Sequence, residues 1–196
     1  MDASVAAARE SQSPAPRTLS VGGPPLTAPP PGYVRDFSES QLGKGSKVFQ
    51  AAKEAILRWT PFDLGWVHVA NPSARLRVDE IAAVEMHTLG LWSLNLSRVV
   101  DLIDAPTQFG FVYSTTTMHV EEGEEKFHIR IEPESGIVWY RIEAFSRPRH
   151  VLAKLGYPIA RQLQHRFVRE SHKRMRREVG ANTPHPNPVP NPLPPA

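Results

Sequence analysis

Apolar side chains recur along residues 45–59, "GSKVFQAAKEAILRW", at steps of three and four residues. This spacing is typical of one face of an α-helix and predicts a first helix. Ser46 is a suitable N-cap for this helix, and Pro61 is expected to end it. The apolar face comprises Val48, Phe49, Ala52, Ala55, Ile56 and Trp59.

From residue 65 onward the apolar period changes toward two, which indicates β-strands. In "EKFHIRI", Phe127, Ile129 and Ile131 share one face, as expected of a half-buried strand. The segments rich in β-branched and aromatic residues are 65–70, 80–92, 97–104, 108–117, 125–131 and 136–145.

The connections between these segments are short. "VEEGE" before Phe127 and "EPESG" before Ile137 have the length of hairpin loops and contain glycine. Because a parallel pair needs a crossover of a dozen or more residues, these links predict an antiparallel meander.

An apolar row runs through the basic stretch 145–177 at steps of three and four residues, which predicts a long C-terminal helix with one inward face. The fold class is therefore α+β: a curved antiparallel sheet of about six strands that grips this helix. Such an arrangement can leave a cavity between sheet and helix. The row consists of Leu152, Leu155, Ile159, Leu163, Phe167 and Met175.

Composition sets the boundaries of the folded part. The chain has 196 residues, of which 40% are hydrophobic, and 20 are prolines. Seven prolines lie between Pro14 and Pro31 and seven between Pro184 and Pro195, so both ends lack apolar periodicity. We expect disordered proline-rich tails at 1–32 and 180–196, and a single domain at 33–179.

Several classes of protein are excluded or disfavoured. The absence of cysteine excludes disulfide frameworks and thiolate catalysis. The N-terminal region does not resemble a secretory signal, and no window approaches the ~18 apolar residues of a membrane helix, so a cytoplasmic protein is expected.

Long blocks of the chain resemble an uncharacterised family known as domain of unknown function nineteen-ninety. The blocks are "LGKGSKVFQAAKEAILRW", "LGWVHV", "LGLWSLNLSRVV", "FGFVY", "HVEEGEEKF" and "VWYRIEAFSRPRHVLAKLGYPIARQLQHRF". The chain departs from the family pattern at "STTTMH" and at Asn95, which is followed by Leu96. The resemblance implies an architecture similar to the START and birch-pollen-allergen helix-grip superfamily, whose members hold apolar ligands between sheet and helix.

The first hypothesis for function is a non-enzymatic domain that binds an apolar small molecule or lipid in such a cavity. The candidate ligand contacts are Tyr113, Trp139, Arg141, Leu155, Ile159 and Leu163.

A second hypothesis is an enzyme of the cyclase or isomerase type that works by acid–base chemistry. It requires Glu85, His87, Asp101 or Glu143 to converge in the cavity, whereas the same residues on a solvent-facing side would be ordinary cross-strand charge pairs.

Other charged groups carry weaker indications. His119 lies beside a group of glutamates, Glu121, Glu122, Glu124 and Glu125. A histidine beside carboxylates could act as a general base or collect a cation, but a solvated hairpin tip is the favoured interpretation of this group. Arg147 and Arg149 flank Pro148, where they could receive an anionic head group or form an internal ion pair.

The last helix suggests a third hypothesis, an adapter that docks on anionic membranes or nucleic acid. Residues 161–177 hold seven cationic residues against one glutamate, although a solvated outer face is the favoured interpretation and nucleic-acid binding is disfavoured. Neither a phosphate loop nor a paired-histidine motif is present in the sequence, so no cofactor and no metal is expected.

Overall fold

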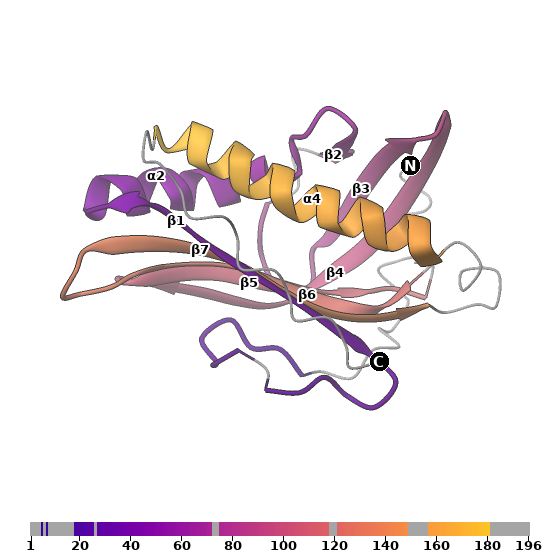
Figure 1. Ribbon diagram of the computed structural model, residues 1–196, viewed down its shortest axis with the longest axis horizontal. Coiled ribbons are helices and arrows are strands. Elements are labelled where there is room, and N and C mark those ends of the chain that lie inside the picture. The colour runs from indigo at the N-terminus through magenta and orange to yellow at the C-terminus, as the bar shows by residue number, and fades with distance from the viewer. Residues whose placement is uncertain are drawn as a thin grey trace.

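A seven-stranded antiparallel sheet forms the body of the protein (Figure 1). The computed structural model describes residues 5, 7, 18–25, 27–71, 75–117, 121–148 and 157–180. Neighbouring strands follow the order β1-β7-β6-β5-β4-β3-β2. The strands are β1 (Val34–Lys44), β2 (Val67–Val69), β3 (Ile81–Thr88), β4 (Leu91–Ala105), β5 (Gln108–Thr115), β6 (Glu121–Ile131) and β7 (Ile137–Pro148).

The antiparallel meander expected from the sequence is confirmed. However, β1 was not predicted, and one predicted strand joins residues that belong to two strands. β1 carries Asp36, Ser38 and Ser40 on its inward positions, so it lacks the apolar alternation of a half-buried strand. Residues 80–92 were expected to be one strand, whereas a tight turn at Leu89 and Gly90 separates β3 from β4. Both turn residues have positive φ, 52° and 76°, as a two-residue hairpin turn requires.

In the part of the chain that the structure describes, the sheet is accompanied by α2 (Ser46–Leu57), the 3₁₀ helix η1 (Thr60–Phe62) and α4 (Tyr157–Glu178). Gly45, with φ at 92°, precedes α2, and no side chain caps it, so the expectation that Ser46 is the N-cap was wrong. α2 also ends at Leu57, four residues before Pro61, and Pro61 belongs to η1.

Both α2 and α4 lie on the same side of the sheet, its concave face (Figure 1). The core fills the space between them and the sheet. Phe111 and Phe127 stack on neighbouring strands with ring centroids 5.1 Å apart. Trp59, between α2 and η1, forms an edge-to-face pair with Phe111 at a centroid distance of 5.3 Å. These rings and Met175 of α4 belong to one continuous cluster of buried apolar side chains, whose removal from water stabilises the fold.

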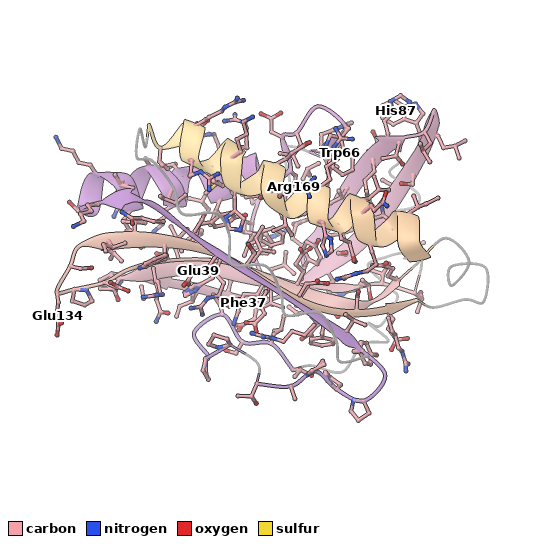
Figure 2. The ribbon with its side chains drawn as sticks, in the orientation of Figure 1. Phe37, Glu39, Trp66, His87, Glu134 and Arg169 are labelled. Atoms are coloured by element: carbon pink, nitrogen blue, oxygen red, sulfur yellow. The ribbon has the colours of Figure 1, made fainter. Side chains whose placement is uncertain are left out.

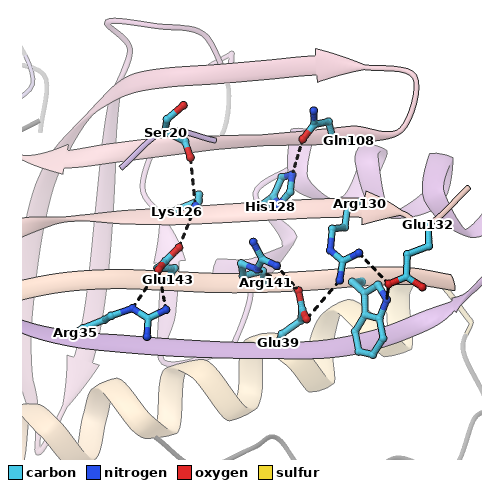
Figure 3. A network of polar contacts seen from close by, with 11 residues as sticks. Ser20, Arg35, Glu39, Gln108, Lys126, His128, Arg130, Glu132, Arg141 and Glu143 are labelled. Atoms are coloured by element: carbon cyan, nitrogen blue, oxygen red, sulfur yellow. Dashed lines mark hydrogen bonds and ion pairs between the residues drawn. The ribbon is translucent and has the colours of Figure 1, made fainter. Parts of the chain in front are cut away.

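The opposite, convex face of the sheet carries a ladder of ion pairs (Figure 3). Lys126 and Glu143, on adjacent strands, are both fully buried, and their Nζ and Oε2 atoms lie 2.9 Å apart. Arg35 pairs with the same glutamate at 3.0 Å. Further along the sheet, Glu39 of β1 binds the guanidinium groups of Arg141 and Arg130.

Residues 18–25 and 27–33 form an N-terminal segment that covers the buried part of this ladder, on the side of the sheet away from α4 (Figure 1). Leu19 and Val21 are buried against Val112 and Phe145. Backbone N–H groups of this segment donate to the carboxylates of Glu124 and Asp101, and Lys126 donates to the carbonyl of Ser20.

Residues 18–25 and 27–32, assigned from the sequence to a proline-rich tail, belong to the described structure, in which Leu19 and Val21 are buried. The rest of the expected N-terminal tail, apart from residues 5 and 7, and residues 181–196 of the C-terminal tail lie outside the described residues. Within the part of the chain that the structure describes, no helix is long and apolar enough to cross a membrane.

The Lys126–Glu143 pair yields a prediction about stability. Lys126→Met leaves the buried Glu143 carboxylate without its ammonium partner, so the free energy of unfolding should fall by about 3 kcal/mol. Urea unfolding followed by circular dichroism measures this change.

Two further variants control the experiment. Lys47→Met removes an exposed lysine of α2 and should change the stability by less than about 0.5 kcal/mol. Adding Glu143→Leu to Lys126→Met should restore most of the loss, because both members of the fully buried pair are then apolar. Arg35 loses its carboxylate in this double variant, but its side chain is partly exposed to water. The single variant Glu143→Leu is measured as well. A double variant whose loss of stability equals the sum of the losses in Lys126→Met and Glu143→Leu would contradict the assignment of the pair.

Candidate functional site

A pocket of about 730 Å³ lies between the concave face of the sheet and the N-terminal half of α4. Side chains from β1, η1, β2, β3, β4, β5, β6, β7 and α4 line it. Its volume is in the range of sites that hold small organic molecules. The residues that α4 contributes are Ala160, Leu163, Gln164, His165, Phe167, Val168 and Arg169.

The two halves of α4 have different relations to the sheet. In the C-terminal half, Ser171 and His172 are buried and hydrogen-bond Tyr140 at 2.9 Å and Ser40 at 2.7 Å, respectively. Burial lowers the pKa of His172 to about 3, so this histidine is neutral and acts as an anchor. These contacts hold the C-terminal half against the sheet, while the N-terminal half roofs the pocket.

Aromatic and aliphatic side chains form much of the pocket wall. Phe62 of η1 lies 5.5 Å from Phe167 of α4 and 5.0 Å from Phe127 of β6, measured between ring centroids. Val84 and Met86 of β3 provide the facing wall. Water in contact with such a wall can form no hydrogen bonds to it. Replacing this water with an apolar molecule is therefore favourable.

One end of the pocket is polar and is centred on Glu125 of β6. The hydroxyl of Tyr113, on the neighbouring strand β5, donates a short hydrogen bond to Oε2 of Glu125. Burial, opposed by the tyrosine hydrogen bond and assisted by the nearby carboxylates of Asp36 and Glu121, raises the pKa of Glu125 to about 7. Burial and the adjacent carboxylate also raise the pKa of Tyr113, which therefore stays a donor.

A second polar group at this end joins the sheet to α4. Arg161 of α4 binds both carboxylate oxygens of Asp36 on β1, and its Nη1 donates to Gln164 at 2.9 Å. Gln164 in turn donates to Glu121 at 3.1 Å. Burial raises the pKa of Glu121, while Arg161 lowers it. Asp36, Glu121, Glu125 and Gln164 all line the pocket.

Two of the six candidate ligand contacts lie in the pocket wall, namely Tyr113 and Leu163. Ile159 is 50% exposed, so its expected inward position was wrong. Leu155, like Leu152, lies outside the described residues.

The remaining two ligand candidates, Trp139 and Arg141, lie on the convex face, so the expectation that they contact a ligand in the pocket was wrong. Arg141 pairs with Glu39, and Arg130 covers the ring of Trp139. Figure 2 shows Phe37 and Glu39, which share this face, on the side of the sheet away from α4.

The four acid–base candidates do not line the pocket either. Glu85 and His87 alternate with the pocket-lining Val84 and Met86, so their side chains point away from it. Glu85 pairs with His68 at 3.0 Å, and His87 stacks on Trp92 with ring centroids 4.5 Å apart.

Asp101 and Glu143 are also on the convex face. A β-bulge between Val99 and Asp101 reverses the alternation of β4, so Asp101 pairs with Val112 and accepts from the N–H of Val21. Glu143 is held by Lys126 and Arg35. The acid–base hypothesis built on these four side chains therefore has no support from the geometry of the pocket.

The glutamate group near His119 is not a solvated hairpin tip, because Glu121–Ile131 form strand β6. Glu121 and Glu125 face the pocket, while Glu124 on the opposite face accepts from the backbone of the N-terminal segment. His119 itself lies outside the described residues.

Of the two roles considered for Arg147, an anion site and an internal ion pair, the structure shows the ion pair. Its Nη2 lies 2.9 Å from Oε1 of Glu122, and its guanidinium covers the ring of Tyr33. Arg149 lies outside the described residues.

Several cations of the basic stretch on α4 are engaged within the protein. Arg161 binds Asp36, Arg166 binds Glu170 at 2.8 Å, and Arg174 binds Glu178 at 2.7 Å. These pairs reduce the charge that the helix presents outward. Across the described ranges, no group of three or more histidine or acidic side chains is placed to hold a metal ion.

Comparison with known proteins identifies the family. The model described as "Domain of unknown function (DUF1990)" matches residues 19–174. The chain belongs to this family. The DUF1990 match includes the N-terminal segment that packs on the convex face and most of α4.

The chain is also similar to individual proteins. It is 36% identical over 158 residues to a UPF0548 protein of Dictyostelium discoideum, covering 75% of this chain and 73% of that protein. A UPF0548 protein of Arabidopsis thaliana is 28% identical over 157 residues, covering 77% and 76%. A conserved protein from Geobacillus kaustophilus has a similar fold, with a TM-score of 0.51 at 8% identity over 78% of this chain and 99% of that one. The helix-grip architecture expected from the sequence is confirmed.

The most informative residue of this DUF1990 pocket, Glu125, was considered only as one of the glutamates near His119, and a solvated hairpin tip was the favoured interpretation of that group. The sequence did indicate its orientation, because side chains alternate along a strand. Glu125 therefore lies on the same face as Phe127, Ile129 and Ile131, which were assigned to the buried side. Asp36 could not be found in this way, since the strand that carries it was not expected.

Glu125 yields a prediction about pH. Its pKa is raised on folding, from 4.5 to about 7, so between these values the native chain holds a proton that the unfolded chain has lost. The carboxyl therefore lowers the stability increasingly as the pH rises through this window, and the loss is complete above pH 7. Glu125→Gln should be more stable than wild type at pH 8 by about 2 to 3 kcal/mol, and close to wild type at pH 4.

Urea unfolding at pH 4, 6 and 8 measures the difference. Glu134→Gln, in the exposed turn between β6 and β7, makes the same change of charge far from the pocket (Figure 2) and should show no such pH dependence. Equal stabilities of Glu125→Gln and wild type at all three pH values would contradict the raised pKa.

Proposed function

We propose that the protein binds an apolar small molecule or lipid in the pocket between the sheet and the N-terminal half of α4. The observation that carries the proposal is the pocket itself, which is about 730 Å³ in volume and has a largely apolar surface. Protein interiors rarely keep such a volume without an occupant, because each unfilled contact costs dispersion and transfer energy.

The arrangement of the pocket supports a binding function. It does not support catalysis by the acid–base candidates taken from the sequence, because none of them lines the pocket. Phe62, Val84 and Phe167 supply apolar contacts, whereas Tyr113 and Glu125 form one polar end. A few convergent polar groups in an apolar pocket fix the orientation of a bound molecule. The anchored C-terminal half of α4 keeps the roof in place.

A variant that fills the pocket tests the proposal. Ala160 lies on α4 and lines the pocket, so Ala160→Trp places an indole where the occupant would lie. Binding of the neutral fluorescent probe N-phenyl-1-naphthylamine should weaken about tenfold, as measured by fluorescence titration.

The matched control is Ala51→Trp on α2, a partly exposed helical alanine that does not line the pocket. Its affinity for the probe should equal that of wild type, and the thermal midpoints of both variants verify folding. If wild type fails to bind the probe, or if both tryptophan variants bind it equally well, the proposal is wrong.

A further inference from the structure

The polar end of the pocket is richer in carboxyl groups than in cations. Asp36, Glu121 and Glu125 line it from β1 and β6, and Arg161 of α4 is bound to Asp36. The two cationic or titratable side chains that α4 adds to the lining, His165 and Arg169, are exposed. An occupant therefore meets an excess of carboxyl groups at this end.

Within the described part of the chain, one buried side chain of the same wall lacks a partner. Ser38 follows Asp36 by two residues on the same face of β1, lines the pocket and is 7% exposed. No hydrogen-bond partner for its Oγ lies within reach in the described structure. Buried hydroxyl groups are rarely left in this state, so Ser38 indicates that a polar group of an occupant completes this end of the pocket.

From these observations we propose that the occupant is an apolar molecule with a protonated amine, and that the amine binds at Glu125. This inference rests on the proposed function and names the chemical class of its ligand. A carboxylate ligand would meet Glu121 and Glu125 at close range, which is unfavourable in a poorly solvated site. A primary ammonium group has three donors, enough for the carboxylate of Glu125, the carboxylate of Glu121 and the hydroxyl of Ser38.

The pairing of Tyr113 with Glu125 suits this role. The tyrosine hydroxyl donates to one carboxylate oxygen and leaves the other available to the ligand. The groups that face Glu125 are Tyr113 of β5, Asp36 of β1, Glu121 of β6 and Tyr140 of β7. Both tyrosines stay neutral, because burial raises the pKa of each. A bound cation would therefore be the main stabiliser of the ionised Glu125 carboxylate.

Binding of an amine should consequently be coupled to release of a proton. In the free protein Glu125 is mostly protonated at pH 6, since its pKa is about 7. An aliphatic amine stays protonated to about pH 10, by analogy with lysine, so its affinity should rise between pH 6 and pH 8 and then level off.

Three probes with the same eight-carbon chain, octylamine, 1-octanol and octanoate, separate charge from apolar contact. At pH 8, displacement of N-phenyl-1-naphthylamine should show octylamine binding at least tenfold more tightly than octanoate, with 1-octanol between them. Calorimetry at pH 6 in buffers of different ionisation enthalpy should show release of most of one proton with octylamine and none with 1-octanol.

Glu125→Gln should weaken octylamine at least tenfold, remove the proton release and leave 1-octanol within threefold of wild type. Glu134→Gln, which loses the same charge in an exposed turn, should bind all three probes as wild type does. The thermal midpoint of each variant verifies that it is folded.

The outcomes distinguish the two proposals. If the fluorescent probe and 1-octanol bind to wild type but octylamine has no advantage over octanoate, the amine inference is wrong and the proposed function stands. The amine inference is wrong in the same way if octylamine binds equally well to Glu125→Gln. If neither the fluorescent probe nor 1-octanol binds to wild type, the proposed function fails, and the inference fails with it.

Discussion

The structure depends on the strict alternation of side chains across a sheet that is covered on both faces. Each strand must supply apolar or matched side chains to the helices on one side and to the N-terminal segment on the other. On the convex side the match combines the ion pairs of Lys126, Glu143 and Arg35 with an apolar cluster around Val112 and Phe145. On the concave side the core is apolar, and polar side chains gather mainly where β1, β4 and β6 line the pocket.

This division explains why the pocket lies where it does. The C-terminal half of α4 is fixed to the sheet by Tyr140 and Ser40, so the core beneath it is closed. Beneath the N-terminal half of α4, the inward positions of β1 and β4 carry small and polar residues where a closed core would have large apolar ones. Ser38, Ser93 and Ser97 all line the pocket, and side chains of this size leave volume that nothing from α4 fills. The cavity is thus a consequence of residue size at inward positions of two strands.

The sequence predicted the architecture well because helical and strand periods are local properties. The α2 region and the strands β5 to β7 follow directly from apolar spacing, and short glycine-containing links are sufficient to make them antiparallel. β1 was missed because its inward positions are polar, which is the same feature that opens the pocket. Where a pocket is lined by polar residues of a strand, that strand lacks the apolar alternation by which it would be predicted from the sequence.

The choice of face was harder to predict than the strands. Trp139, Arg141 and Glu143 were all expected to face the cavity, but the alternate set on β7, Val138, Tyr140 and Ile142, is the more apolar and faces the core. Asp101 could not be placed by counting, since the bulge beside Val99 depends on pairing with β5 and leaves no mark in the local sequence.

The central claim is that the pocket is a binding site for a small apolar molecule, and native mass spectrometry of the full chain purified from cells tests it most directly. We predict a one-to-one complex whose extra mass is released on collisional activation as a small molecule, and its absence from the Ala160→Trp variant. A spectrum that shows only the bare chain for wild type, or the same adduct on wild type and Ala160→Trp, would contradict this claim.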